Sequence, residues 1–171
     1  FANGRYLVSG LTDAQQADLV ASLALTAERS AAAGAAVKKP RIGLFRPWSG
    51  SMDEGWTRWL LEQYGFEYVT LRPADFKAPL AGKVDAVILA DDARLPLEGA
   101  PAGRGGRGAV RPEYADRLTP ADVSAFEQFV RGGGTVICLN SASTFAIQQF
   151  KLPVKNVAAG LRTDDFFLHG T

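Results

Sequence analysis

Residues 40–68, PRIGLFRPWSGSMDEGWTRWLLEQYGFEY, form the segment that most constrains how this chain can fold. The apolar run at 42–45 follows a proline and is typical of a buried parallel strand. After a loop, Ser51 and Glu54 have the spacing of a capping box that begins a helix. Gly65 suits the left-handed residue that ends a helix, and a second strand is expected directly after it. The segment therefore predicts a strand–loop–helix–strand unit.

The helix predicted in this unit carries large apolar side chains at helical spacing. They fall at positions i, i+4, i+7, i+8 and i+12, and they are Met52, Trp56, Trp59, Leu60 and Tyr64. One broad apolar face of this kind normally packs against the rest of the protein. We therefore expect Trp56 and Trp59 in the core. Trp48 lies in the preceding loop, where it is expected to be exposed and able to stack on a sugar or peptide ring.

Strands and helices continue to alternate along the chain. The further predicted strands are residues 66–71, 83–90 and 135–139. Thr119, followed by a proline, begins a helix between the last two of these strands, and a shorter helix is expected to run to about Phe150. This order predicts an α/β domain with a doubly wound, flavodoxin-like, mostly parallel sheet and helices on both faces.

The segments outside this alternation are expected to be accessory to it. Residues 1–39 are predicted to be an N-terminal arm, with one helix from the cap at Thr12 to about Ser30, and residues 40–171 are predicted to be the α/β domain. Two alternatives remain for residues 152–154 and 165–168: they form edge strands, or they complete the structure of a neighbouring part of the protein. From its first and last residues, we expect the chain to be a piece of a longer protein.

Composition excludes several classes of partner. Nineteen basic and 18 acidic residues give a net charge of +1, so no overall field attracts nucleic acid or a membrane surface. No apolar run approaches the roughly 20 residues that span a bilayer, and the sequence contains no signal peptide. A single cysteine excludes an internal disulfide. With 47% hydrophobic and 22% charged residues, the composition is that of an ordinary globular protein.

Polar residues follow the predicted strands where a doubly wound sheet binds its ligands. Such ligands lie beyond the carboxyl ends of the strands. We therefore predict that one group of residues rims any pocket for a peptide or small molecule: Arg46, Trp48, Ser51, Asp91, Asp92, Asn140 and Ser141. Adjacent acids could help to hold a hard cation, but they more commonly form solvated turns. One histidine and one cysteine cannot form a zinc site of the usual kind, so no metal site is predicted.

Cys138 is the one candidate for a thiol nucleophile, and the sequence around it argues against catalysis. In class I glutamine amidotransferases the nucleophile sits in a Gly-x-Cys-x-Gly turn, whereas Val136 and Asn140 take the glycine positions here. Cys138 also lies in an apolar run, where cysteine behaves as a small buried hydrophobe. His169, the sole histidine, has no acid placed to orient it. We predict no catalytic residue, with a hydrolase that uses Cys138 as the alternative.

Several phrases resemble the C-terminal region of large bacterial zinc carboxypeptidases. They are RPWSGSMDEGWTRWLLEQ, DAVILADD, GGGTVICLNSASTFAI and LPVKNV, and the resemblance covers residues 40–160. In that family a metallopeptidase domain precedes a class I glutamine amidotransferase-like domain. The resemblance implies a secreted or periplasmic protein whose zinc belongs to a peptidase domain that this chain does not contain. No His-x-x-Glu zinc motif is present to carry the peptidase activity.

The resemblance therefore implies a non-catalytic accessory domain that binds a substrate or a partner. Its first expected partner is the peptidase domain of the parent protein. A homodimer is a further expectation, because the arm at 1–39 and the segment after residue 151 both carry apolar residues that need partners.

Overall fold

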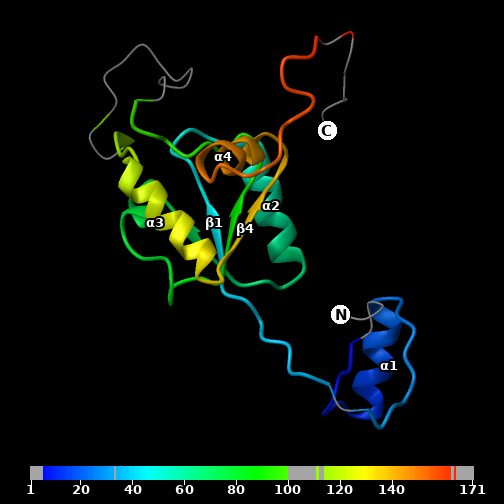
Figure 1. The fold of residues 1–171 in the computed structure, drawn as a ribbon. Coiled ribbons are helices and arrows are strands. Elements are labelled where there is room, and N and C mark those ends of the chain that lie inside the picture. Colours follow the sequence, from blue (N-terminus) through cyan, green and yellow to red (C-terminus); the bar gives the residue numbers. More distant parts are fainter. Residues whose placement is uncertain (1–5, 33, 100–110, 112–113, 163, 165–171) are drawn as a thin grey trace. The chain divides into compact units, whose positions relative to one another are not determined.

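The computed structural model describes residues 6–32, 34–99, 111, 114–162 and 164. The chain separates into two units, residues 1–39 and residues 40–171 (Figure 1).

The first unit contains one helix, α1, at Asp13–Ser22. Thr12 caps it through a reciprocal capping box with Gln15, as the sequence predicts. The expected continuation to about Ser30 is wrong. The helix ends because Ala24 adopts a left-handed φ of +49°, and the backbone N–H of Leu25 donates back to Val20 at 3.0 Å. No residue of α1 is buried.

The second unit is built on a parallel sheet of β1 (Ile42–Phe45), β2 (Tyr68–Leu71), β3 (Ala86–Leu89) and β4 (Thr135–Cys138). The strand order is β2-β1-β3-β4, and every neighbouring pair is parallel. The chain winds outward from β1 in one direction to β2 and then in the other direction to β3 and β4. The predicted doubly wound, flavodoxin-like α/β fold is confirmed.

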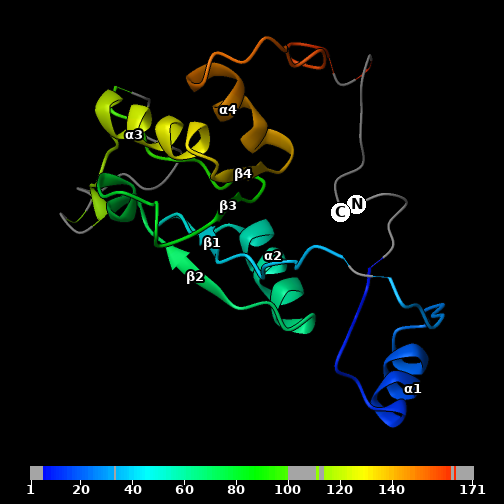
Figure 2. The same ribbon diagram turned by 60° about the horizontal axis from the view of Figure 1, so that its bottom comes forward.

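Helices lie on both faces of the sheet. Figure 2 shows α2 (Met52–Gln63) on one side, and α3 (Pro120–Arg131) and α4 (Ser143–Gln149) on the other. Two short 3-10 segments, η2 (Pro73–Lys77) and η4 (Asn140–Ala142), complete the described elements. The Thr119 cap and the Ser51 cap are both present, and Gly65 has the predicted left-handed φ of +65°. Local sequence signals therefore mark the starts of α2 and α3 and the end of α2 correctly.

The larger hydrophobic core lies between the sheet and the α3–α4 layer. Phe126 is at its centre, with ring centroids 5.1 Å from Phe76 and 5.6 Å from Phe150. A smaller cluster under α2 consists of Ile42, Leu44 and Ile88, with Leu61 and Tyr68 partly buried against it. The buried members of the larger cluster include Phe45, Leu71, Phe76, Val87, Leu89, Phe126, Phe129, Ala146 and Phe150.

Helix α2 turns its apolar face outward, so the expectation that Trp56 and Trp59 lie in the core is wrong. Trp56 is 61% exposed and Trp59 is 52% exposed. The side of α2 that faces the sheet is instead largely polar, and its Glu54 is buried, with an exposed fraction of 4%. The capping box predicted at Ser51 is only half formed, because the Ser51 hydroxyl accepts the N–H of Glu54 at 3.1 Å whereas the Glu54 carboxylate accepts a hydrogen bond from Arg58.

A polar network joins this side of α2 to β2. The Arg58 guanidinium donates to the Tyr68 hydroxyl at 3.0 Å and to Thr70 Oγ1 at 3.2 Å. The Tyr68 hydroxyl in turn donates to Glu62 Oε1 at 2.5 Å. A helix whose polar residues are bound to the sheet must direct its apolar residues to the other side. The network is therefore the physical reason for the outward apolar face.

The segment after α4 does not form the edge strand that the sequence left open at 152–154, because those residues have no strand structure. The second possible strand, at 165–168, lies outside the described residues. None of the helices in the described ranges has both the length and the apolar character that crossing a membrane requires.

Candidate functional site

The carboxyl ends of β3 and β4 bring three of the predicted rim residues together, with Asn140 and Ser141 both bound to Asp91. Asn140 Nδ2 donates to Asp91 Oδ2 at 2.6 Å. Ser141 donates to Asp91 Oδ1 twice, from its backbone N–H at 3.1 Å and from its hydroxyl. Because β3 and β4 are parallel neighbours, residues just past their ends must lie at the same edge of the sheet. Asp91 is thus the centre of a hydrogen-bond network at this edge.

Ser51 and Asp92 extend this network. The Ser51 hydroxyl donates to the backbone oxygen of Asp91 at 3.2 Å, which links the start of α2 to the end of β3. The backbone N–H of Asp92 donates to Ser141 Oγ at 3.2 Å and to Asp91 Oδ1 at 2.8 Å. The carboxylate of Asp92 is exposed and pairs with Arg94 at 3.6 Å. Five of the predicted residues therefore belong to one network, which we call the Asp91 network: Ser51, Asp91, Asp92, Asn140 and Ser141.

The network keeps Asp91 ionised. Partial burial acts to raise the pKa of Asp91, but hydrogen bonds from Ser141, Asn140 and the backbone N–H of Asp92 outweigh it. The pKa of Asp91 is therefore held below its ordinary value. A carboxylate of lowered pKa is a weak general base at neutral pH. The Ser141 hydroxyl, which donates to it, is consequently held in position without being activated as a nucleophile.

Replacing Asp91 by asparagine is expected to lower the free energy of unfolding by about 2 kcal/mol at neutral pH, because the carboxylate accepts several hydrogen bonds that an amide cannot all accept. The folded pKa lies below the unfolded one, so this stabilisation is complete above the unfolded pKa of about 3.9 and is lost as pH falls through the folded pKa. Urea unfolding of the wild-type chain and of Asp91→Asn, at neutral and at acidic pH, measures this difference in the free energy of unfolding.

The matched control for Asp91→Asn is Asp92→Asn, at an exposed neighbouring carboxylate that has a left-handed φ of +56°. Asparagine tolerates this backbone conformation, so the change is expected to cost under about 0.5 kcal/mol. An equal effect of the two substitutions, or an Asp91 effect that persists at acidic pH, would contradict the assigned role of Asp91.

Arg46 and Trp48 belong to a second group, beyond the ends of β1 and β2. Trp48 is 40% exposed, and its ring centroid lies 4.9 Å from that of Tyr114. The Arg72 guanidinium lies 4.2 Å from the centre of the Trp48 ring, a cation–π contact. Arg72 also donates to the backbone oxygens of Arg46 at 3.2 Å and Pro47 at 3.1 Å. Trp48 is exposed as expected, but its ring already has two partners in this chain.

Sequence reasoning missed Arg72 and Tyr114 as members of this second group. The position of Arg72, immediately after β2, is the signal that could have identified it, because the carboxyl end of that strand opens at the same edge as the others. Burial, followed by the nearby charge of Arg46, lowers the pKa of Arg72 from its ordinary value. Tyr114 lies outside the strand alternation and gave no such signal.

Asn140 lies at the turn that connects β4 to α4. A strand-to-helix turn is present after β4, although the sequence has no glycine at this position. It is made by Asn140, whose φ is +43°, and asparagine tolerates the left-handed region better than most residues. The asparagine amide has no ionisable group that could serve as an acyl-transfer nucleophile.

Cys138 precedes Asn140 by two residues. It is the last residue of β4, it is half-buried, and it packs against the larger hydrophobic core. Burial raises the pKa of its thiol, which favours the less nucleophilic protonated form. His169, the only histidine that could act as its base, lies outside the described residues. The described geometry therefore does not activate Cys138.

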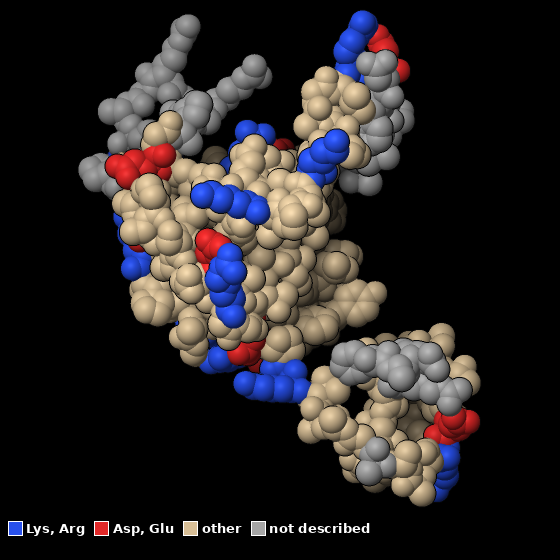
Figure 3. Space-filling view, viewed as in Figure 1, with Lys and Arg blue, Asp and Glu red and all other residues tan. Residues whose placement is uncertain are grey.

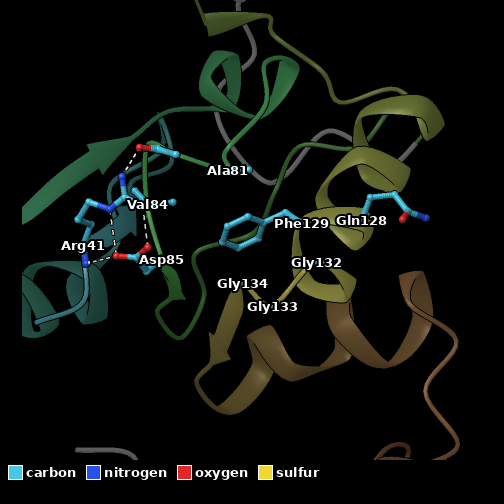
Figure 4. A pocket seen from close by; sticks show the side chains of 10 residues that line it. Arg41, Ala81, Val84, Asp85, Gln128, Phe129, Gly132, Gly133 and Gly134 are labelled. Atoms are coloured by element: carbon cyan, nitrogen blue, oxygen red, sulfur yellow. Dashed lines mark hydrogen bonds and ion pairs between the residues drawn. The ribbon is translucent and has the colours of Figure 1, made fainter. Parts of the chain in front are cut away.

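A pocket of about 250 Å³ lies at the opposite edge of the sheet, near the strand amino ends (Figure 4). Arg41 and Asp85 form its polar side, with Arg41 Nη2 2.7 Å from Asp85 Oδ1 and a further bond from Arg41 to the backbone oxygen of Gly82. Phe129 and Gly134 lie across from them, and a Cβ at Gly134 would fall 2.4 Å from the Phe129 ring. This glycine is therefore required by packing. None of the predicted rim residues lines this pocket.

Within the described ranges, no group of three or more His, Cys, Asp or Glu residues is placed to hold a metal ion. Comparison of the chain with protein-family models, with curated proteins and with solved structures finds no match.

Proposed function

We propose that residues 40–171 form a non-catalytic accessory domain, which serves a larger enzyme by binding a substrate or partner. The proposal unites two observations. The chain has a doubly wound sheet whose carboxyl edge carries the ordered Asp91 network. Its sequence phrases resemble the amidotransferase-like domain of bacterial zinc carboxypeptidases. Peptidase chemistry and zinc would then reside in a separate domain, which would be the first partner of this one, in a secreted or periplasmic protein.

The observation that carries the proposal is the occupant of the turn after β4. In an amidotransferase-like hydrolase, this turn presents the nucleophile at the carboxyl edge of the sheet. Here the turn presents Asn140, and the amide of Asn140 is used to bind Asp91 at 2.6 Å. The edge is therefore organised by hydrogen bonds that stabilise it, which suits binding better than acyl transfer.

The alternative function is an amidotransferase-like hydrolase that uses Cys138. It requires a thiolate that is exposed at the edge and paired with a base. The packing of Cys138 against the core and the raised pKa of its thiol both disfavour this function.

Turnover assays separate the two functions. We expect the full chain to hydrolyse neither glutamine nor activated esters above the rate of a heat-unfolded sample, because Asn140 cannot act as a nucleophile and Cys138 is not activated. The matched variants are Cys138→Ala and Asn140→Ala. Hydrolysis that Cys138→Ala abolishes, while Asn140→Ala leaves it intact, would overturn the accessory function in favour of the alternative.

A further inference from the structure

An apolar stripe runs along the outward side of α2. Its large members are all more than half exposed: Met52, Trp56, Trp59, Leu60 and Tyr64. Trp56 and Trp59 contact each other edge to face, with ring centroids 6.0 Å apart. We call these five residues, together with Gly55, the α2 stripe. Isolated exposed apolar residues are ordinary on a protein surface, but a contiguous group of this size marks an interaction site.

The sheet beside α2 adds to this surface. Ile137 of β4 pairs in register with Ile88 of β3, which belongs to the small cluster under α2, so both side chains lie on the same face. Ile88 is buried, whereas Ile137 is 43% exposed. Figure 2 shows α2 on this face of the sheet, and α3 and α4 on the opposite face. Ile137 is therefore a further exposed apolar side chain on the face of the sheet that carries α2.

The size of the stripe suits a protein interface. Aromatic side chains bury about 150–250 Å² each, so the exposed parts of the stripe amount to roughly 600 Å². Two such surfaces in contact would bury about 1,200 Å², which is the lower end of the range for stable protein complexes. A surface of this area is at the upper limit of what monomers leave exposed.

Gly55 is a second and independent indication that another backbone approaches α2. It lies inside the helix on the exposed side, where glycine destabilises a helix relative to alanine. A Cβ added to Gly55 would meet no atom within 4 Å, so packing within this chain does not require a glycine. A glycine on an outward helix face instead allows a neighbouring helix to come close.

The charges of α2 point to a second copy of this chain as the occupant. Glu54 and Arg58 are paired on the inward side, and Glu62 accepts the Tyr68 hydroxyl there. The six residues of the stripe are uncharged, and Asp53, the remaining charged residue of α2, lies in the first turn of the helix beside Met52. In a two-fold dimer each residue meets a copy of the same surface, and like charges would repel. Figure 3 shows an uncharged flank at the place of α2 in the same view.

We propose that the α2 stripe is the interface of a homodimer, in which α2 packs against α2 of a second copy around a two-fold axis. Gly55 lets the two helices approach, and Trp56 and Trp59 fill the contact. Antiparallel packing of two identical stripes would bury the exposed aromatic side chains without any other partner. This interface is independent of the Asp91 network and of the proposed accessory function.

Sedimentation velocity of the full chain over a wide range of concentrations tests this proposal. The wild-type chain is expected to show a concentration-dependent monomer–dimer equilibrium. Trp59→Glu is expected to raise the dimer Kd about thirtyfold or more, because a charged residue would then face the apolar contact of the second copy. Val157→Glu is the matched control, since Val157 is 77% exposed and lies outside the stripe, and its Kd is expected to be unchanged.

Gly55→Ala distinguishes a dimer contact from an effect on folding. Alanine is expected to raise the urea midpoint of the chain at concentrations where it is monomeric, because it favours the helix. It is also expected to raise the dimer Kd about tenfold, because the added methyl group separates the helices. A chain that is monomeric at every concentration, or a dimer equally affected by Val157→Glu or unaffected by both stripe variants, would overturn the proposal.

Discussion

Replacing Phe126 by alanine is expected to lower the free energy of unfolding by about 4 kcal/mol, the largest effect of any substitution considered for this chain. Phe126 is 3% exposed and lies among aromatic rings from three elements, with Phe76 from η2 and Phe145 from α4 on two sides. Removing its ring leaves a cavity that the rigid neighbours cannot close. Urea unfolding followed by circular dichroism measures the loss.

Phe126→Leu is the control for the aromatic cluster. Leucine keeps most of the apolar volume, so a cost of about 1.5 kcal/mol is expected. If the alanine variant loses less than the leucine variant, or both lose almost nothing, then the cluster around Phe126 is not the core of the α/β unit. This outcome would contradict the described packing of α3 and α4 on the sheet.

Replacing Arg58 by alanine is expected to lower the free energy of unfolding by about 3 kcal/mol, because it leaves the buried Glu54 carboxylate without its charged partner. The substitution also removes the bonds from Arg58 to the Tyr68 hydroxyl and to Thr70, which tie α2 to β2. The same urea experiment measures the loss.

The matched control for Arg58→Ala is Arg131→Ala on α3. Arg131 also pairs with a glutamate four residues earlier, Glu127, but this pair is on the surface. It is expected to contribute under about 0.5 kcal/mol. Replacing Glu54 and Arg58 together by leucine is expected to recover most of the lost stability, since no charge is then buried alone. Equal costs at Arg58 and Arg131 would contradict the structural role given to the network.

The strands of this fold, the starts of α2 and α3 and the end of α2 are predictable from sequence because they depend on local signals. The apolar run of β1, the caps at Ser51 and Thr119, and the glycine after α2 each determine their own neighbourhood. The orientation of α2 is not local. The spacing of Trp56 and Trp59 shows that the helix has an apolar side, but not which surface that side meets. The sequence signal for its orientation was the pair Glu54 and Arg58, four residues apart, because it indicates that the polar side of α2 also makes contacts within the chain.

The Asp91 network is predictable in part for a topological reason. Once the strands are known to be parallel, residues just past β3 and β4 must meet at one edge, which places Asp91 beside Asn140 and Ser141. The left-handed turn at Asn140 was missed because only glycine was considered for it. The contact of Trp48 with Tyr114 joins segments that no sequence pattern connects.

The most direct measurement of the central claim, that this domain is built without a working nucleophile, is the rate at which iodoacetamide alkylates Cys138 as pH is varied. We predict slow alkylation of the folded chain at neutral pH, with a rate that rises only above the ordinary pKa of a cysteine, because burial raises the pKa of this thiol. Urea-unfolded chain should react faster at every pH. Rapid alkylation of the folded chain at neutral pH, with an apparent pKa below that of unfolded cysteine, would contradict the claim.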